Sequence, residues 1–150
     1  MSKKAIRFLL GVAALGLWIS LVAMSWSDAS VRLKKVQVVQ NGAHPEVSLI
    51  FDGKIKLGQY RADFFRDVVQ VTLTDAQIHP AKITHLSGGK VSKLFAYQFG
   101  PKVVRARFTV SGNAEDFKEL LVLRASGNQI TVRFDGQGPR HDATVIKTSA

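Results

Sequence analysis

Apolar side chains recur at every second position in six short segments of this chain. The segments are Val36-x-Val38, Val47-x-Leu49-x-Phe51, Val69-x-Val71-x-Leu73, Phe95-x-Tyr97-x-Phe99, Ala106-x-Phe108-x-Val110 and Ile130-x-Val132-x-Phe134. Successive side chains of an extended strand point to opposite faces, so each segment has one apolar and one polar face. Turn sequences separate them: Asn41-Gly42, Asp52-Gly53, Ser87-Gly88-Gly89, Ser111-Gly112, Ser126-Gly127 and Asp135-Gly136. The pattern predicts an all-β fold, either a sandwich or a small barrel.

The alternating segments also repeat when the chain is shifted by 59 residues. The shift places Val36, Val38 and Gln40 on Phe95, Tyr97 and Phe99, the series Val47 to Gly53 on Ala106 to Gly112, and Val71 and Leu73 on Ile130 and Val132. Two unrelated β stretches can also be slid into register, so coincidence is the alternative. A duplicated half favours two similar facing sheets that remove their apolar faces from water, worth ~25 cal/mol per Å². We therefore expect a small sandwich, with Phe95, Tyr97, Phe99 and Phe108 facing its core.

The sequence divides into three stretches, residues 1–29, 31–136 and 137–150. Residues 31–136 hold the alternation and form the expected domain, in which helix is scarce. The segment Glu115–Leu120 is either a turn capped by Asn113 or the entry to a strand. The alternation ends after Gly136, so residues 137–150 are expected to form a flexible C-terminal tail.

Residues 1–29 have the composition of an export signal. Basic residues between Lys3 and Arg7 precede a run from residue 8 to 26 that contains no charge, and small residues follow up to Ala29. The run includes Phe8, Leu15, Trp18 and Trp26. It is close to the ~20 residues that span a membrane, so it is either a cleaved signal peptide or a retained inner-membrane anchor. Both alternatives place the domain outside the cytoplasm, in the periplasm.

The chain is strongly basic and has no cysteine. It has 21 Lys plus Arg against 11 Asp plus Glu, a formal charge of +10. Removing the three basic residues and one acid of the leader leaves 18 against 10, or +8. This balance favours anionic partners such as envelope polymer phosphates, acidic glycans or peptidoglycan carboxylates, and export argues against nucleic acid. The lack of cysteine excludes disulfides, thiolate zinc sites and cysteine nucleophiles.

No catalytic or metal-binding motif is evident. The four histidines form no His-x₃-His or His-Glu-x₂-His unit, and Ser87-Gly88-Gly89-Lys90 is better interpreted as a tight turn than as a Ser-x-x-Lys nucleophile. We expect no enzymatic activity, no cofactor and no metal. A hydrolase is the least favoured function.

The candidate binding residues combine basic and aromatic side chains. They are Arg61, Phe64, Phe65, Arg66, Lys102, Arg105 and Arg107. Aromatic rings suit sugar stacking, and the guanidinium fork suits carboxylates. Arg105 and Arg107 share the outward phase of one strand, and the adjacent Phe64 and Phe65 cannot both point inward. The alternative is that these are ordinary solvated surface residues.

An export signal followed by a duplicated β pattern resembles the AMIN domain, which occurs in periplasmic N-acetylmuramoyl-L-alanine amidases and type IV pilus secretins. The likeness covers Leu33 to Asp135 and is carried by the stretches 36–51, 66–76 and 104–110, with Thr72 where an acidic residue is common. The resemblance implies two small facing β-sheets and a non-catalytic targeting module that binds peptidoglycan. No amidase or secretin domain follows, so we expect a free-standing module.

The sequence therefore favours an exported envelope protein that binds peptidoglycan or docks an envelope complex. The alternative is a membrane-anchored structural or assembly subunit of a pilus, secretion or flagellar machine that binds partner proteins by its sheet edges. A third possibility is a carrier for lipid or an exported chain, which would lie between the sheets.

Overall fold

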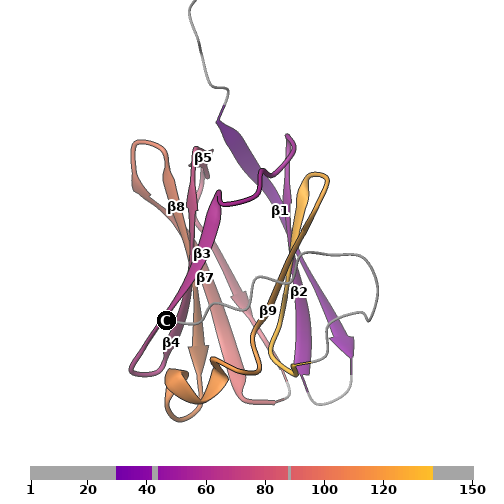
Figure 1. Cartoon of the computed structure of the whole chain (residues 1–150), viewed down its shortest axis with the longest axis vertical. Helices are drawn as coiled ribbons and strands as arrows, with labels where there is room; N and C mark the ends of the chain where they lie inside the picture. The colour runs from indigo at the N-terminus through magenta and orange to yellow at the C-terminus, as the bar shows by residue number, and fades with distance from the viewer. Residues whose placement is uncertain (1–29, 42–43, 88, 137–150) are drawn as a thin grey trace, which may run out of the picture.

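The computed structural model describes residues 30–41, 44–87 and 89–136, which form two β-sheets packed face to face (Figure 1). The all-β fold with two facing sheets is confirmed. Within the described residues, no helix has the length and apolar character needed to cross a membrane. The predictions for the leader, with Phe8, Leu15, Trp18 and Trp26, and for the tail 137–150 lie outside the described residues.

The first sheet has the strand order β5-β1-β2-β10-β9, and the second has the order β3-β4-β8-β7-β6. The strand bounds are β1 Val31–Asn41, β2 His44–Phe51, β3 Tyr60–Phe65, β4 Val68–Thr74, β5 Ala76–Gln77, β6 Lys82–His85, β7 Val91–Gly100, β8 Val103–Val110, β9 Val122–Ser126 and β10 Gln129–Arg133. The pairing is antiparallel throughout except between β1 and β5. The six alternating segments fall on β1, β2, β4, β7, β8 and β10. The strands β3, β5, β6 and β9 were not predicted.

The two halves of the repeat are interleaved between the sheets. The bounds of β2 and β8 differ by the 59-residue shift at both ends. The hairpin β1–β2 pairs with β10, from the second half of the chain, and β8 pairs with β4, from the first half. Each half therefore contributes one hairpin to each sheet, rather than forming a sheet of its own.

The register in which β2 pairs with β10 in the first sheet differs by two residues from the register in which β8 pairs with β4 in the second. In the first sheet Leu49 lies opposite Ile130, and the 59-residue shift converts this pair to Phe108 and Val71. In the second sheet Phe108 instead lies opposite Val69. A slip of two residues keeps every side chain on its own face, whereas a slip of one would exchange the faces. The sandwich interior is therefore apolar on both sides.

A single core lies between the sheets. Phe51, Phe108 and Phe134 are among its largest fully buried side chains. The ring of Phe134 meets Phe108 edge-on at 5.2 Å and Phe117 at 5.9 Å between centroids. The prediction that Phe108 faces the core is confirmed.

The prediction that Phe95, Tyr97 and Phe99 face the core is wrong. Leu94 and Ala96 are the fully buried residues of β7, while Phe95 and Tyr97 are half-buried and Phe99 is 55% exposed. The aromatic side chains of β7 therefore lie on the outer face of the second sheet.

A β-bulge explains why the faces of β7 are exchanged. In the first sheet Val36 lies opposite Leu49, which the shift would convert to Phe95 opposite Phe108. Instead Leu94 lies opposite Phe108, because the register slips between Gln98 and Gly100. A bulge inserts one unpaired residue, and a one-residue slip moves every side chain beyond it to the other face.

The short segment after β8 forms a 3-10 turn, η1 (Ala114–Phe117). The Asn113 side-chain oxygen accepts a hydrogen bond from the Glu115 backbone N–H at 3.1 Å and so caps it. Of the two sequence alternatives for this segment, the capped turn is the one observed.

Candidate functional site

The outer face of the second sheet gathers most of the predicted binding residues. Cross-strand partners on one face of a sheet lie side by side, so the strand register sets their order. Three rows cross the sheet: Arg61–Thr72–Arg105–Tyr97, then Asp63–Gln70–Arg107–Phe95–Ile83, then Phe65–Val68–Thr109–Lys93–His85. Arginines thus alternate with aromatic and small polar side chains on one surface, which we call the aromatic–arginine face.

Each central arginine is held against an aromatic ring. The guanidinium carbon of Arg105 lies 3.3 Å from the centroid of the Phe99 ring, and that of Arg107 lies 5.5 Å from the centroid of Phe65. Both distances are within the range of cation–π attraction. Phe99 reaches Arg105 because the bulge places it on this side of the sheet. The rings therefore fix the guanidinium groups over the strands.

Phe95 and Tyr97 form a second aromatic element next to the arginines. Their rings are stacked, with centroids 4.8 Å apart and planes inclined by 18°. Phe95 lies opposite Arg107 and Tyr97 opposite Arg105 in the register. A flat aromatic surface of this kind can lie against the apolar face of a sugar ring.

The two central arginines are not neutralised within the described part of the chain. No carboxylate of the described residues lies within 4.0 Å of the guanidinium of Arg105 or Arg107. The Nε atoms of both are buried without a hydrogen-bond partner. An unpaired buried donor is unfavourable, and a bound anion that drew the guanidinium outward would relieve this.

The remaining charges leave this face positive. Arg61 forms an ion pair with Asp63 at 3.5 Å, but both side chains are largely exposed, so the pair contributes little to stability. Lys93, beside Thr109, adds a fourth basic residue to Arg61, Arg105 and Arg107. One acid therefore stands against four basic side chains on the face: Arg61, Lys93, Arg105 and Arg107.

A groove of ≈ 420 Å³ opens at the end of this face where β3, β4 and β8 meet the β7–β8 turn. Tyr60, Arg61, Thr72, Phe99 and Arg105 line it. Burial raises the pKa of Tyr60 above its usual 10.0, against the smaller opposing effect of its backbone hydrogen bond with Ala125. Tyr60 is therefore uncharged at neutral pH, and the charged side chains of the groove are those of its arginines.

The other predicted binding residues are distributed around this face. Phe64 packs against the core while Phe65 is 38% exposed, because the side chains of adjacent strand residues point to opposite faces. Arg66 lies in the β3–β4 turn with φ of 52°, and Lys102 is exposed in the β7–β8 turn at the opposite end of the sheet. Arg61, Phe65, Arg105 and Arg107 are thus brought together, and Arg66 and Lys102 lie at the margins.

Sequence reasoning missed Phe95, Tyr97 and Phe99 as surface residues because it assigned them to the core. The signal that could have placed them was the second apolar alternation, Leu94-x-Ala96, in the same strand. It also missed Gln70 and Thr72, whose buried side chains lie between the arginines and β3 and hydrogen-bond each other at 3.3 Å.

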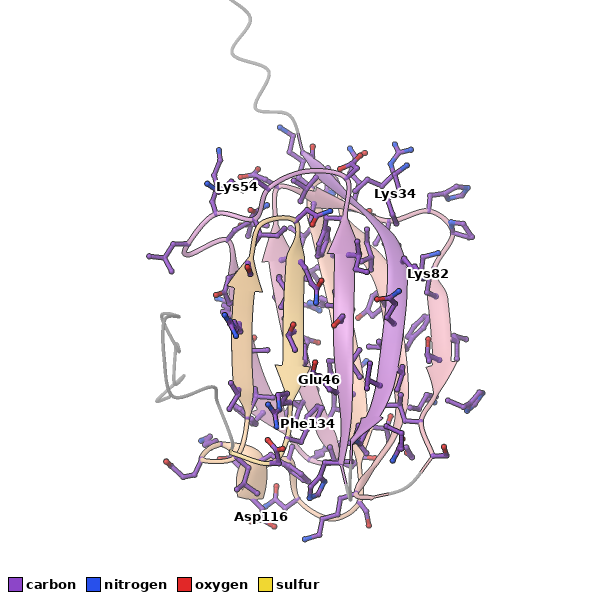
Figure 2. All side chains as sticks on the ribbon, turned by 90° about the vertical axis from the view of Figure 1, so that its right-hand side faces the viewer. Lys34, Glu46, Lys54, Lys82, Asp116 and Phe134 are labelled. Atoms are coloured by element: carbon purple, nitrogen blue, oxygen red, sulfur yellow. The ribbon has the colours of Figure 1, made fainter. Side chains whose placement is uncertain are left out.

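The outer face of the first sheet, which is turned toward the viewer in Figure 2, carries paired charges. Arg133 is paired there with Glu46 at 3.6 Å and with Asp135 at 2.8 Å, and Gln129 donates to Ser48 at 2.9 Å. The register gives this face no Phe, Tyr or Trp among the described residues. Arg124 on this face also has a buried Nε with no hydrogen-bond partner, but no described aromatic ring lies beside it, and Arg133 is neutralised by its two carboxylates. The two sides of the sandwich therefore present unequal surfaces.

No group of three or more metal-ligating side chains is close enough to hold an ion in residues 30–41, 44–87 and 89–136. Ser87 and Lys90 lie in the connection between β6 and β7. The aromatic–arginine face is therefore the feature with the clearest chemistry.

Comparison of the chain with family models, with curated proteins and with solved structures gives no match in any of the three.

Proposed function

We propose that this protein is an exported, non-catalytic component of the cell envelope whose aromatic–arginine face binds peptidoglycan or another anionic envelope polymer. The observation that carries the proposal is the pair Arg105 and Arg107, which are held against aromatic rings and have no carboxylate partner among the described residues.

The chemistry of the face suits a polymer of sugars and carboxylates. Stacked rings offer an apolar surface for a sugar ring, and arginine binds a carboxylate through two parallel hydrogen bonds. A rigid sheet holds both groups in place, so little side-chain entropy is lost on binding. This chemistry suits a polymer that presents carboxylates beside sugar rings, as peptidoglycan does through its stem peptides.

The periplasmic location in this proposal is inferred from the sequence. Residues 1–29 act as a signal peptide or as an inner-membrane anchor and deliver the domain to the periplasm. The resemblance to the AMIN domain supports the same role, with an AMIN-like sandwich that arose by duplication and serves to localise a protein at the wall.

Co-sedimentation with isolated sacculi tests the proposal. We expect the wild-type protein to sediment at low salt and to be released as salt rises, because ions screen exposed charges. Arg105→Gln combined with Arg107→Gln should abolish sedimentation. The matched control, Arg124→Gln combined with Lys35→Gln, removes the same charge from the first sheet and should sediment normally. Equal loss in both variants, or no sedimentation of the wild type, would contradict the proposal.

Among the described residues the outer edge of β1 has no strand partner beyond Arg32, which favours a second candidate function, a structural or assembly subunit of an envelope machine that binds partner proteins by its sheet edges. Partner proteins should then co-purify in fixed ratio from solubilised membranes. Recovery of the protein without them would count against it.

A further inference from the structure

The end of the sandwich at which β1 begins carries many exposed basic side chains. The Asp52 N–H donates to the Arg32 oxygen at 3.0 Å, which joins the β2–β3 loop to β1. The Ala76 N–H donates to the Lys102 oxygen at 3.1 Å, which brings the β7–β8 turn beside β5, the neighbour of β1. We call the exposed basic residues of these segments the basic end: Arg32, Lys34, Lys35, Lys54, Lys56 and Lys102.

No carboxylate of the described residues neutralises the basic end. Asp52 and Asp75 are the acids nearby, and no ion pair between described residues includes a side chain of the basic end. The Asp52 carboxylate instead accepts from the Arg32 backbone N–H at 2.7 Å. The side chains of the basic end are therefore free to meet an external anion.

The turns at the opposite end of the strands have the reverse balance of charge. They carry Asp67, Glu115, Asp116 and Glu119 against Arg66, Lys90 and Lys118. Figure 2 shows Asp116 at this end and Lys34 and Lys54 at the other. A domain with a positive and a negative end is oriented by the field of an anionic surface, with its basic end foremost.

The basic end also presents an apolar side chain at a fixed position. Leu57, in the β2–β3 loop, is 72% exposed, the most exposed large apolar side chain of the described residues. Gly58 follows it with φ of 82°, a conformation that glycine adopts without strain. The Gln59 side chain accepts from the Lys56 N–H at 2.9 Å and donates to the Thr74 oxygen at 2.9 Å. The loop that carries Leu57 is therefore fastened to β4.

The position of the basic end in the chain indicates what it meets. The Val31 N–H donates to the Asp75 oxygen at 2.9 Å, so the described chain begins at this end. Residue 30 follows the uncharged run 8–26 by four residues, which span at most about 14 Å when extended. A run retained in a bilayer would thus hold the basic end at the membrane surface.

We propose that the basic end binds the surface of an anionic phospholipid bilayer, with Leu57 inserted among the lipid headgroups. Lysine and arginine are attracted to lipid phosphates, and a buried apolar side chain adds to that attraction. An anionic polymer would match the charges of the basic end but not the exposed Leu57 beside them. This surface is separate from the residues that the proposed function assigns to the polymer, apart from Lys102 at their margin.

A fluorescent label at Leu57 tests the contact. The chain has no cysteine, so Leu57→Cys gives one site for an environment-sensitive dye. The matched control is Leu120→Cys, at an exposed leucine of the opposite end. The full chain, as the cell makes it, is combined with phosphatidylcholine vesicles with and without about 30% phosphatidylglycerol.

We expect the dye at Leu57 to shift to the blue and to at least double in intensity with the anionic vesicles, and added salt to reverse much of the change. The dye at Leu120 should not respond. A retained leader inserts into both kinds of vesicle, so the difference between them reports on the domain. No polymer is present, so the result is independent of the proposed function.

Charge substitutions in the labelled Leu57→Cys protein test the basic end itself. Lys54→Gln combined with Lys56→Gln should reduce the gain in fluorescence by roughly half or more, because each lysine near the surface contributes to the attraction. The control Lys90→Gln combined with Lys118→Gln removes the same charge from the opposite end and should respond normally. Thermal melting of each variant checks that the fold is retained.

The absence of a response at Leu57 to anionic vesicles would overturn the proposal. So would equal responses at Leu57 and Leu120, or an equal loss in the two pairs of charge variants. A dye at Leu57 that responds to isolated sacculi but not to vesicles would assign the basic end to the polymer instead.

Discussion

Replacing Gln98 with alanine should destabilise the fold and also disturb the aromatic–arginine face. Gln98 begins the bulge of β7, and its side chain is bonded to backbone groups on three segments. Its Nε2 lies 2.6 Å from the Gly100 oxygen and 3.2 Å from the oxygens of Val103 and Ala76, and its Oε1 accepts from the Ile78 N–H at 2.8 Å. These contacts hold the bulge against β5 and β8.

The size of the effect follows from the number of bonds. The amide has two hydrogens, so Gln98 donates at most two hydrogen bonds at once and accepts one. At about 1 kcal/mol each, the loss of three is about 3 kcal/mol. Water can replace the side chain at the exposed carbonyls, so we expect about 2 kcal/mol. For a domain of roughly 100 residues this lowers the melting temperature by about 8 °C.

Urea and thermal unfolding of the purified variants measure this effect. Gln98→Glu keeps the acceptor for Ile78 but turns a carboxylate toward carbonyl oxygens, so it should be at least as unstable as Gln98→Ala. The control Gln37→Ala, at an exposed position of β1, should stay within about 0.5 kcal/mol of wild type. A Gln98→Ala variant as stable as that control would refute the view that this side chain fixes the bulge. If the stability falls but sacculus binding is unchanged, the link from the bulge to the binding face is wrong.

Two further substitutions probe the interior. Phe108→Ala removes a fully buried ring that packs edge-on against Phe134, and urea unfolding should show a loss of about 3–5 kcal/mol; a loss below ~1 kcal/mol would mean that the core is not packed as described. Tyr60→Phe tests the raised pKa of Tyr60. Because the fold favours the neutral phenol, this residue's contribution to wild-type stability should be fully present below the unfolded pKa of 10.0. The contribution should be lost as pH rises through the higher pKa of the folded state. The urea midpoint of Tyr60→Phe should fall less than that of wild type between pH ~8 and ~11, and parallel curves would contradict this reasoning.

The alternating pattern predicted the fold class and the faces of several strands. β8 alternates strictly over its whole length, with Val104, Ala106, Phe108 and Val110 buried. Arg105 and Arg107 were therefore placed on the outer face correctly from sequence. The prediction works here because the period of two is a property of the strand itself and needs no knowledge of its partners.

The pattern failed in β7 because this strand carries two overlapping apolar alternations. Phe95, Tyr97 and Phe99 offer the larger surface, whereas Leu94 and Ala96 are the residues that face the core. The choice between them depends on the bulge at Gln98, whose partners Ala76 and Ile78 are about 20 residues away in sequence. A local pattern contains no information about that contact.

The sequence by itself determined that the chain forms amphipathic strands, where several of its turns fall, such as Ser111-Gly112 and Ser126-Gly127, and which apolar residues of β2 and β8 are buried, since these follow from local periodicity and composition. Only the tertiary structure decided that each half of the chain contributes a hairpin to both sheets, and that the aromatic residues of β7 lie beside Arg105 and Arg107. Both depend on pairing between distant segments, such as Leu49 with Ile130, where the free energy of burying two faces together selects one register among several that the local pattern allows.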